Sequence, residues 1–264
     1  MAKENRTIKR ALDVLRLLKD RQTPLTITQI GAYLKIPRTS AFDIINTLYQ
    51  EGFIEPGNET EKAYVLGLKS FEIGAAYLQN NDLSPTTRPY LEKLMLLSHA
   101  TAFLAIESGL QLVYLDKVEF PSAVRTSAQL GSRNDMYCSG LGKALLATYP
   151  EEKVRMIFSK TEIKKITENT IVSYAALLDD LQKTRSRGYA VDDREASPEV
   201  FCIAAPIYDS TNNSIAAISL SILYSKLTDE LIEKYSKNII DSALQISKKF
   251  GYMERKLFLQ SVNR

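Results

Sequence analysis

Residues 37–50 carry an apolar stripe at helical spacing, and this stretch constrains the fold more than any other part of the chain. The stripe consists of Ala41, Ile44, Ile45, Leu48 and Tyr49, at positions i, i+3, i+4, i+7 and i+8. Pro37 suits the first turn of such a helix, because the N–H that proline lacks is not needed there. The opposite face carries small polar side chains and fits a DNA major groove, although most amphipathic surface helices share this pattern.

The flanking segments place this helix third in a small module. We expect a first amphipathic helix before it, with the stripe Ile8, Ala11, Leu12, Leu15 and Leu18. Thr26 and Gln29 have the spacing of a capping box, which marks the start of a second helix. Gly52 ends the third helix, and Phe53-Ile54 and Tyr64-Val65-Leu66 are predicted to form two short strands. Three short helices and a hairpin predict a winged helix-turn-helix that binds DNA, with a protein-docking version of the module as the alternative.

Positive charge is concentrated at the N-terminal end of the chain. Residues 1–40 contain nine Lys and Arg against three Asp and Glu, whereas residues 41–82 contain two against seven. This asymmetry is compatible with a phosphate-binding patch. The length of 264 residues is enough for two domains, and the sequence has neither a signal-peptide core nor an apolar run near the roughly 18 residues of a membrane span. We therefore expect a cytoplasmic protein that does not contact a membrane.

The rest of the chain alternates between strand and helix patterns. Strands are predicted at 101–107, 112–118, 122–127, 189–192, 200–208 and 214–223, and helices at 139–149, 151–158, 173–187 and 228–250. Ser84-Pro85 has the N-cap and N1 character of another helix start, and Leu97 is expected on the buried side of that helix. Ser108-Gly109 suits a hairpin turn, and Gly188 suits the position after a helix C-terminus. This order predicts an α+β fold in which an α/β layer contains an antiparallel sheet.

With these elements in place, the sequence resembles the IclR family of bacterial transcriptional regulators. The N-terminal resemblance rests on residues 8–15, 25–30, 36–40, 48–53 and 64–67. The C-terminal resemblance rests on Gly131 and on residues 139–147, 187–190, 202–206 and 216–221. The resemblance covers roughly residues 5 to 225. It implies a winged helix-turn-helix DNA-binding domain over 1–67, a linker helix over 68–82 and a GAF-like effector-binding domain over 83–264.

In that family the third helix enters the major groove and the wing meets the DNA backbone or minor groove. The residues assigned to DNA contact are Arg6, Lys9, Arg10, Thr26, Arg38, Thr39, Ser40, Phe42, Asp43, Asn46 and Lys62. Asp43 stands where the family often has arginine, and the wing is acidic apart from Lys62. We expect the phosphate contacts to come mainly from Arg6, Lys9, Arg10 and Arg38. The helix over 68–82 either packs on its own domain or helps to form a dimer, and the resemblance favours the dimer.

The family's effector pocket lies between a glycine-containing turn and the strands of the second domain. Backbone amides and hydroxyls there hold the carboxylate and the oxo or hydroxyl oxygens of small organic acids. Carried over to this chain, the effector-binding residues are Gly140, Leu141, Asp192, Cys202, Ser219 and Ser221. Without the resemblance, these strand residues read as ordinary buried cysteine and serine. Tyr137 and Glu199 stand beside the motif and could narrow or repolarise the pocket.

Other chemical sites receive less support from the residues. The segment 139–143 is not a phosphate loop, because Tyr137 and Ala144 occupy the positions that need Gly and Ser or Thr. A tight turn without a ligand is the alternative for its glycines. The two cysteines, Cys138 and Cys202, make neither a disulfide scaffold nor a metal cluster, and inert thiols are favoured over a redox sensor.

The single histidine, His99, leaves little material for acid–base or zinc chemistry near neutral pH. We therefore expect no catalytic residue, no metal and no cofactor. The resemblance implies a homodimeric or homotetrameric regulator that binds a pseudo-palindromic operator in double-stranded DNA and responds to a small organic acid. Repression is commoner than activation in the family, and nothing in the residues of this chain decides between the two.

Two alternatives remain open at this point. The first is a hydrolase or transferase with an appended DNA-binding domain, which would need a nucleophile and a base. The second is a metabolite-binding protein whose DNA-binding domain is vestigial, as Asp43 and the acidic wing suggest.

Overall fold

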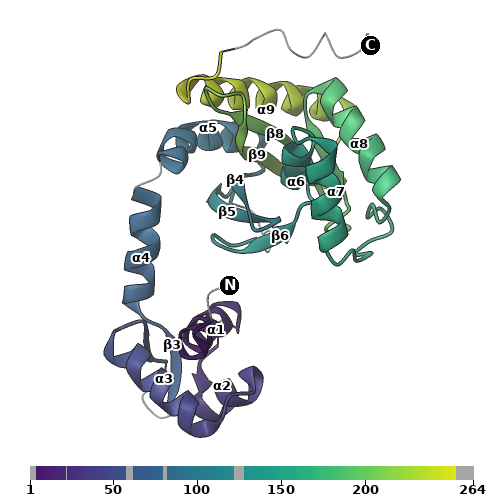
Figure 1. Cartoon of the computed structure of the whole chain (residues 1–264). Helices are drawn as coiled ribbons and strands as arrows, with labels where there is room; N and C mark the ends of the chain where they lie inside the picture. The colour runs from purple at the N-terminus through teal and green to yellow at the C-terminus, as the bar shows by residue number, and fades with distance from the viewer. Residues whose placement is uncertain (1–3, 22, 58–61, 80–81, 122–127, 254–264) are drawn as a thin grey trace. The chain divides into compact units, whose positions relative to one another are not determined.

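The computed structural model describes residues 4–21, 23–57, 62–79, 82–121 and 128–253. The chain divides into two compact units, Met1–Asp82 and Leu83–Arg264, each of which is described by itself (Figure 1). The strand predicted at 122–127 and the wing residues 58–61 lie outside the described residues. Within the described ranges, no helix has the length and apolar character needed to cross a membrane.

The described part of the first unit begins with three helices and a small antiparallel sheet, and a fourth helix follows them. The helices are α1 (Arg6–Arg21), α2 (Ile27–Leu34) and α3 (Arg38–Gln50), and the strands β1 (Leu25–Thr26), β2 (Ile54–Pro56) and β3 (Ala63–Leu66) are ordered β1-β3-β2. The predicted capping box is confirmed, because Gln29 N–H donates to Thr26 Oγ1 at 3.3 Å and Thr26 N–H donates to Gln29 Oε1 at 2.8 Å. Strand β1 was not expected, since two residues are too few to show a period; pairing with β3 makes them a strand.

The core of the first unit lies under the apolar stripe of α3. Ala41, Ile44, Ile45 and Leu48 are buried as predicted, whereas Tyr49 is 46% exposed and instead packs edge-on against Tyr64. The stripe predicted for α1 is partly wrong, because Ile8 and Leu12 are 59% and 48% exposed. The buried side of α1 is centred on Val14 and Leu18, four residues apart.

Helix α4 (Leu68–Gln79) follows β3 and exposes its apolar side chains. Leu68, Phe71, Ile73 and Tyr77 are each more than half exposed. Ser70 connects the start of α4 to the sheet, because its hydroxyl donates to Phe53 O at 2.9 Å.

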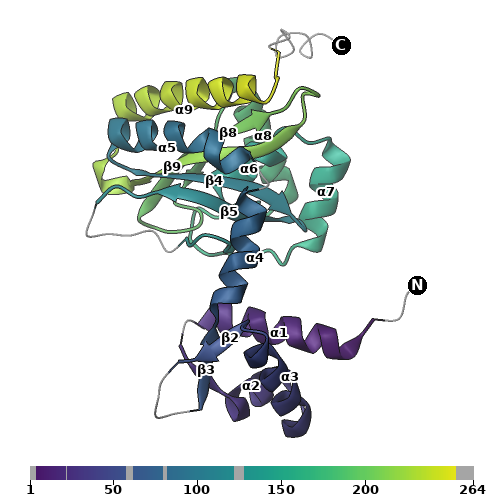
Figure 2. The same cartoon turned by 90° about the vertical axis from the view of Figure 1, so that its left-hand side faces the viewer.

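In the residues that the structure describes, the second unit forms a six-stranded antiparallel sheet with helices on both faces (Figures 1 and 2). The strand order is β6 (Arg133–Asp135), β5 (Gln111–Val118), β4 (Thr101–Ser108), β9 (Ser214–Leu223), β8 (Val200–Tyr208) and β7 (Ala190–Asp193). The predicted antiparallel sheet is confirmed. The turn between β4 and β5 is at Gly109-Leu110, one residue later than expected, and both residues have the positive φ (61° and 72°) that a tight hairpin turn requires.

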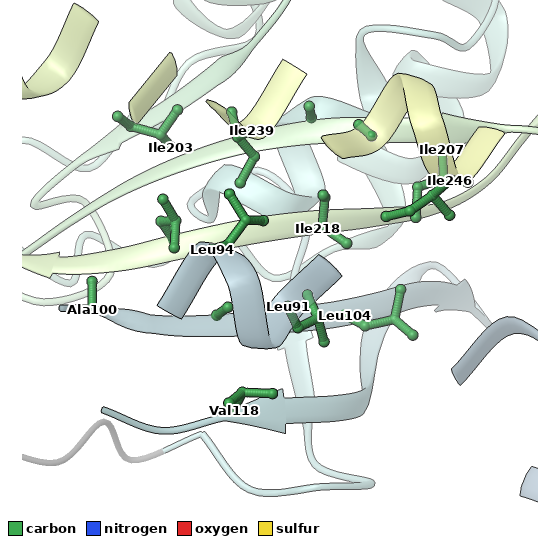
Figure 3. Packing of buried hydrophobic residues seen from close by; sticks show 14 of the residues in the cluster. Leu91, Leu94, Ala100, Leu104, Val118, Ile203, Ile207, Ile218, Ile239 and Ile246 are labelled. Carbon is green, nitrogen blue, oxygen red and sulfur yellow. The ribbon is translucent and has the colours of Figure 1, made fainter. Parts of the chain in front are cut away.

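Helices α5 (Leu83–Ser98) and α9 (Asp229–Lys249) cover one face of this sheet, and Figure 3 shows their side chains packed on the strands. The helices on the other side are α6 (Gly140–Leu146), α7 (Glu151–Lys160) and α8 (Tyr174–Arg187), and a short 3-10 turn covers Tyr224–Lys226. Helix α5 begins at Leu83, two residues before the predicted first helical residue Pro85, and Ser84 Oγ bonds Asp116 Oδ2 at 3.1 Å instead of capping the helix. Leu97 is 45% exposed, contrary to expectation. Gly188 ends α8 with φ 81°, as predicted.

Candidate DNA-binding face and effector site

The exposed face of α3 carries most of the residues assigned to DNA contact. Arg38, Thr39, Phe42, Asp43 and Asn46 are exposed, and Ser40 is half-buried. The α2–α3 turn is compact, because Ile36 N–H bonds Gly31 O at 2.9 Å and Lys35 adopts a left-handed conformation. The turn and the buried stripe of α3 together present the polar face of this helix outward.

The remaining assigned DNA contacts lie on other elements of the same unit. Arg6 and Lys9 are exposed in the first turn of α1, and Arg10, which follows, is half-buried. Lys9 pairs with Glu4 at 2.9 Å, a surface ion pair that is worth little and can be exchanged for a phosphate. Thr26 uses its hydroxyl in the capping box, and Lys62 is exposed just before β3.

The six residues assigned to the effector come together on the α6 side of the large sheet. Register places Asp192 beside Cys202 and Cys202 beside Ser221, so these three form one row across β7, β8 and β9. Ser219 lies two residues along β9 from Ser221, on the same face. Gly140, followed by Leu141, brings the start of α6 to this row.

The α6 turn lies so close to the strands that its glycines cannot be replaced freely. A Cβ on Gly140 would lie 3.2 Å from Cys202 Cβ and 3.7 Å from Asp192 Cβ. A Cβ on Gly142 would lie 2.2 Å from Met136 O, a distance that real side chains do not reach. Ser139 caps the helix by accepting a hydrogen bond from Gly142 N–H at 3.2 Å.

Asp192 is the titratable group at the centre of this arrangement. It is 3% exposed, and burial raises the pKa of its carboxyl to about 7. The backbone N–H of Glu195 donates to Asp192 Oδ1 at 2.7 Å and opposes that rise, whereas the Glu195 charge adds to it and Lys143 lowers it. A carboxyl that titrates near neutral pH can donate a hydrogen bond when protonated and only accept when ionised, so this position can pair with either kind of ligand oxygen.

The two thiols are held in their protonated form. Burial raises the pKa of Cys138 to about 12 and also raises the pKa of Cys202. Cys202 Sγ lies 3.7 Å from Ser221 Oγ, within weak hydrogen-bond distance. Among the described residues, no three His, Cys, Asp or Glu side chains are grouped so as to hold a metal ion.

The assigned effector residues are mostly closed from solvent. Leu141, Asp192 and Ser219 are each less than 5% exposed. Two surface hollows of about 370 and 280 Å³ lie elsewhere, the first beside Arg187 and Ile240 and the second beside the β4–β5 turn. Neither hollow is lined by any of the six residues.

Sequence reasoning missed a buried ion cluster behind the α6 turn. Lys143 is 1% exposed, its Nζ bonds the Glu195 carboxylate, and it lies 2.9 Å from Asp180 Oδ2. The one signal was that Lys143 stands among residues that are otherwise apolar or glycine, which indicates a buried helix. Its partners are 37 and 52 residues away, and nothing in their spacing connects them to it.

Comparison with known proteins matches both units to one family. The model described as "Bacterial transcriptional regulator IclR C-terminal" matches residues 75–248, and the "IclR helix-turn-helix domain" matches residues 7–57. The HTH-type transcriptional repressor AllR of Escherichia coli K12 is 33% identical over 244 residues, which are 92% of this chain and 90% of AllR.

Solved structures of the same family share the fold. The crystal structure of the Thermotoga maritima IclR has a TM-score of 0.77 and 30% identity, and the match covers 93% of this chain and 99% of that one. An IclR homologue of Microbacterium hydrocarbonoxydans, crystallised with 4-hydroxybenzoate, has a TM-score of 0.80 and 21% identity, with coverage of 92% and 98%.

Proposed function

The chain belongs to the IclR family of bacterial transcriptional regulators, and from this premise we propose that it is a repressor whose operator binding responds to a small organic acid. As a member of that family it is a DNA-binding transcriptional regulator. We propose repression and not activation because AllR, which is 33% identical, is named a repressor. A regulator that acts on operators works where the DNA is, so the proposal places it in the cytoplasm.

The observation that carries the DNA-binding part is the exposed polar face of α3. Arg38 and Asn46 lie on that face, above a stripe of buried residues that fixes the rotation of the helix. Arg38 can contact phosphate or guanine, and Asn46 has the paired donor and acceptor that read adenine. Asp43 cannot bind phosphate, but its carboxylate can accept a hydrogen bond from cytosine N4.

The proposed oligomer is a homodimer, or a homotetramer built from dimers, on a pseudo-palindromic operator. Exposed apolar side chains on α1 and α4 support it, because more than half of Ile8 and Phe71 is open to solvent in the single chain. Side chains of this kind mark interaction surfaces when they recur along one element. A twofold dimer would place two α3 helices on two half-sites.

The proposed effector site is the face that gathers Gly140, Leu141, Asp192, Cys202, Ser219 and Ser221. Hydroxyls and a carboxyl that titrates near pH 7 suit an acid that also carries an oxo or hydroxyl oxygen. The acid can shift operator binding only by binding two arrangements of the protein with different affinity.

Selection of bound duplexes from a random DNA library by the purified full-length protein tests the proposal. Enrichment of an inverted repeat supports a dimeric operator reader, and the enriched duplex then serves as the probe for acids that release it. Arg38→Ala should weaken this binding, whereas Arg16→Ala serves as the matched control, because Arg16 is an exposed arginine of α1 that is not assigned to DNA. No enrichment with or without a pool of 2-oxo, 2-hydroxy and aromatic acids would contradict the proposal.

A further inference from the structure

The buried ion cluster around Lys143 joins the two walls of the proposed effector site. Lys143 lies on α6, three residues after Gly140, and Glu195 lies in the loop after β7, three residues after Asp192. The carboxylate of Glu195 bonds Lys143 Nζ, while the backbone N–H of the same residue bonds Asp192 Oδ1 at 2.7 Å. Glu195 therefore connects the α6 turn to the carboxyl at the centre of the site.

The loop that carries Glu195 is itself fixed at several points. Thr170 Oγ1 donates to Glu195 O at 2.8 Å, and Thr167 Oγ1 donates to Arg194 O at 2.7 Å. On the other side, Asp180 of α8 lies 2.9 Å from Lys143 Nζ. The ion pair thus sits between two anchored segments, so its geometry sets their separation.

At the effector face, the spacing between the α6 turn and the strands cannot become much smaller. The α6 turn approaches the strands so closely that a methyl group on Gly140 would lie 3.2 Å from Cys202 Cβ. Binding sites work when their groups are held within about 0.5 Å of the productive geometry by surrounding contacts. A change in the distance between α6 and the Asp192 loop would move backbone amides and the carboxyl relative to each other.

Stability alone does not account for the pair. Removing a lysine and a carboxylate from water costs free energy that their attraction often fails to recover, and apolar residues of similar volume are often as stabilising. The Lys143–Glu195 pair is better explained by the spacing that it imposes between the α6 turn and the Asp192 loop.

We propose that Lys143 and Glu195 are positioning residues for the effector: their buried ion pair holds the α6 turn and the Asp192 loop at the spacing that binds a small organic acid. This inference rests on the proposed function, because it assigns a role in the same site. Neither side chain needs to touch the acid.

The first test measures effector response in Lys143→Met and Glu195→Gln variants of the full-length protein. Release from the operator is titrated with pyruvate, lactate, oxaloacetate and 4-hydroxybenzoate. Both variants should need roughly tenfold more acid than the parent for half-release, as is usual when a residue that orients a ligand-binding group is lost. Operator affinity without acid should stay within about threefold, since the ion pair lies in the other unit.

Glu107→Gln is the matched control. Glu107 Oε2 also accepts from a lysine, Lys153, at 2.7 Å, but this pair is partly exposed and includes none of the six effector residues. The control should respond to acid as the parent does. Equal responses in all four proteins, with the parent responding, would overturn the proposal.

A second readout needs no acid and separates this proposal from the proposed function. In a Cys138→Ala background, Cys202 is the remaining thiol and lies directly beneath the α6 turn. Loss of the ion pair should raise the rate at which a disulfide reagent modifies Cys202 in the folded protein by roughly tenfold, because the turn is less firmly held. Circular dichroism establishes that each variant is folded, and Glu195→Gln, which keeps the volume, serves if Lys143→Met does not fold.

The outcomes are therefore distinct. A parent that binds its operator but responds to no acid contradicts the effector part of the proposed function, while Cys202 reactivity still reports on the ion pair. Unchanged reactivity in both folded variants overturns the positioning role. Raised reactivity together with a weakened acid response supports it.

Discussion

Asp192→Asn tests whether the buried carboxyl at the centre of the effector face titrates near neutral pH. Its folded-state pKa of about 7 lies above the ordinary value of 3.8. Between these two values the native state keeps the proton that the unfolded state has lost. Its contribution to stability is therefore full below pH 3.8, falls as the pH rises towards 7 and is absent above that.

The size of the effect follows from the position of the pKa. At about pH 5.5, roughly 1.5 units below the folded-state pKa, proton retention contributes about 2 kcal/mol at about 1.4 kcal/mol per unit. At about pH 8.5 that contribution has disappeared. The parent should thus lose about 2 kcal/mol more than Asp192→Asn across this interval, because asparagine does not titrate.

Pulsed thiol labelling during urea denaturation provides the assay. Both cysteines of the chain, Cys138 and Cys202, lie in the unit that contains Asp192, so labelling reports the unfolding of that unit. Asp193→Asn removes a half-exposed carboxylate at the next position and should show the pH dependence of the parent. The same pH dependence in the parent and in Asp192→Asn would refute the reasoning.

Three further predictions concern DNA binding, packing and assembly. Arg38→Ala should lower the slope of log affinity against log salt by roughly 0.9, measured by fluorescence anisotropy on the selected operator; a collapse for Lys62→Ala with no effect of Arg38→Ala would contradict the assignment. Gly142→Ala should destabilise by about 1–3 kcal/mol or more in denaturation, because its Cβ would lie 2.2 Å from a backbone oxygen, whereas Gly74→Ala, with open space around it, should not destabilise. Phe71→Ser should raise the dimer dissociation constant roughly tenfold to a hundredfold in sedimentation experiments, and an unchanged constant would exclude α4 from the interface.

Elements with local signals could be predicted from the sequence. The capping box of α2 and the glycine after α8 depend on two or three neighbouring residues, and both are present in the structure. Strands β8 and β9 also have the predicted bounds, because they are long enough to show their pattern. Strands β1 and β6, with two and three residues, are too short for a period and exist only through pairing with distant segments.

Apolar patterns could not distinguish a core from an exposed surface. Ile8 and Leu12 of α1 follow helical spacing, yet they face away from the core of their unit. The same limitation applies to Leu97 on α5. Hydrophobic spacing shows which apolar residues share one face of a helix. It does not show whether that face packs against the core of the same unit.

The candidate site was even less accessible to reasoning from residue types. The α6 turn and the strand residues were assigned by family resemblance, since serine and cysteine in strands carry no specific chemical signal. Strand register then accounts for their meeting, because it aligns Asp192, Cys202 and Ser221 in one row. The contact between Lys143 and Glu195 spans 52 residues and needed the three-dimensional structure.

The large sheet ends in its two shortest strands, and both carry charge. Strand β6 has three residues and includes Arg133 and Asp135, while β7 has four and ends in Asp192-Asp193. Short, charged outer strands disfavour hydrogen bonding to a strand of another molecule. The charged outer strands therefore act against strand-by-strand growth of this sheet between copies of the unit, and they favour assembly through side-chain surfaces of the helices and loops.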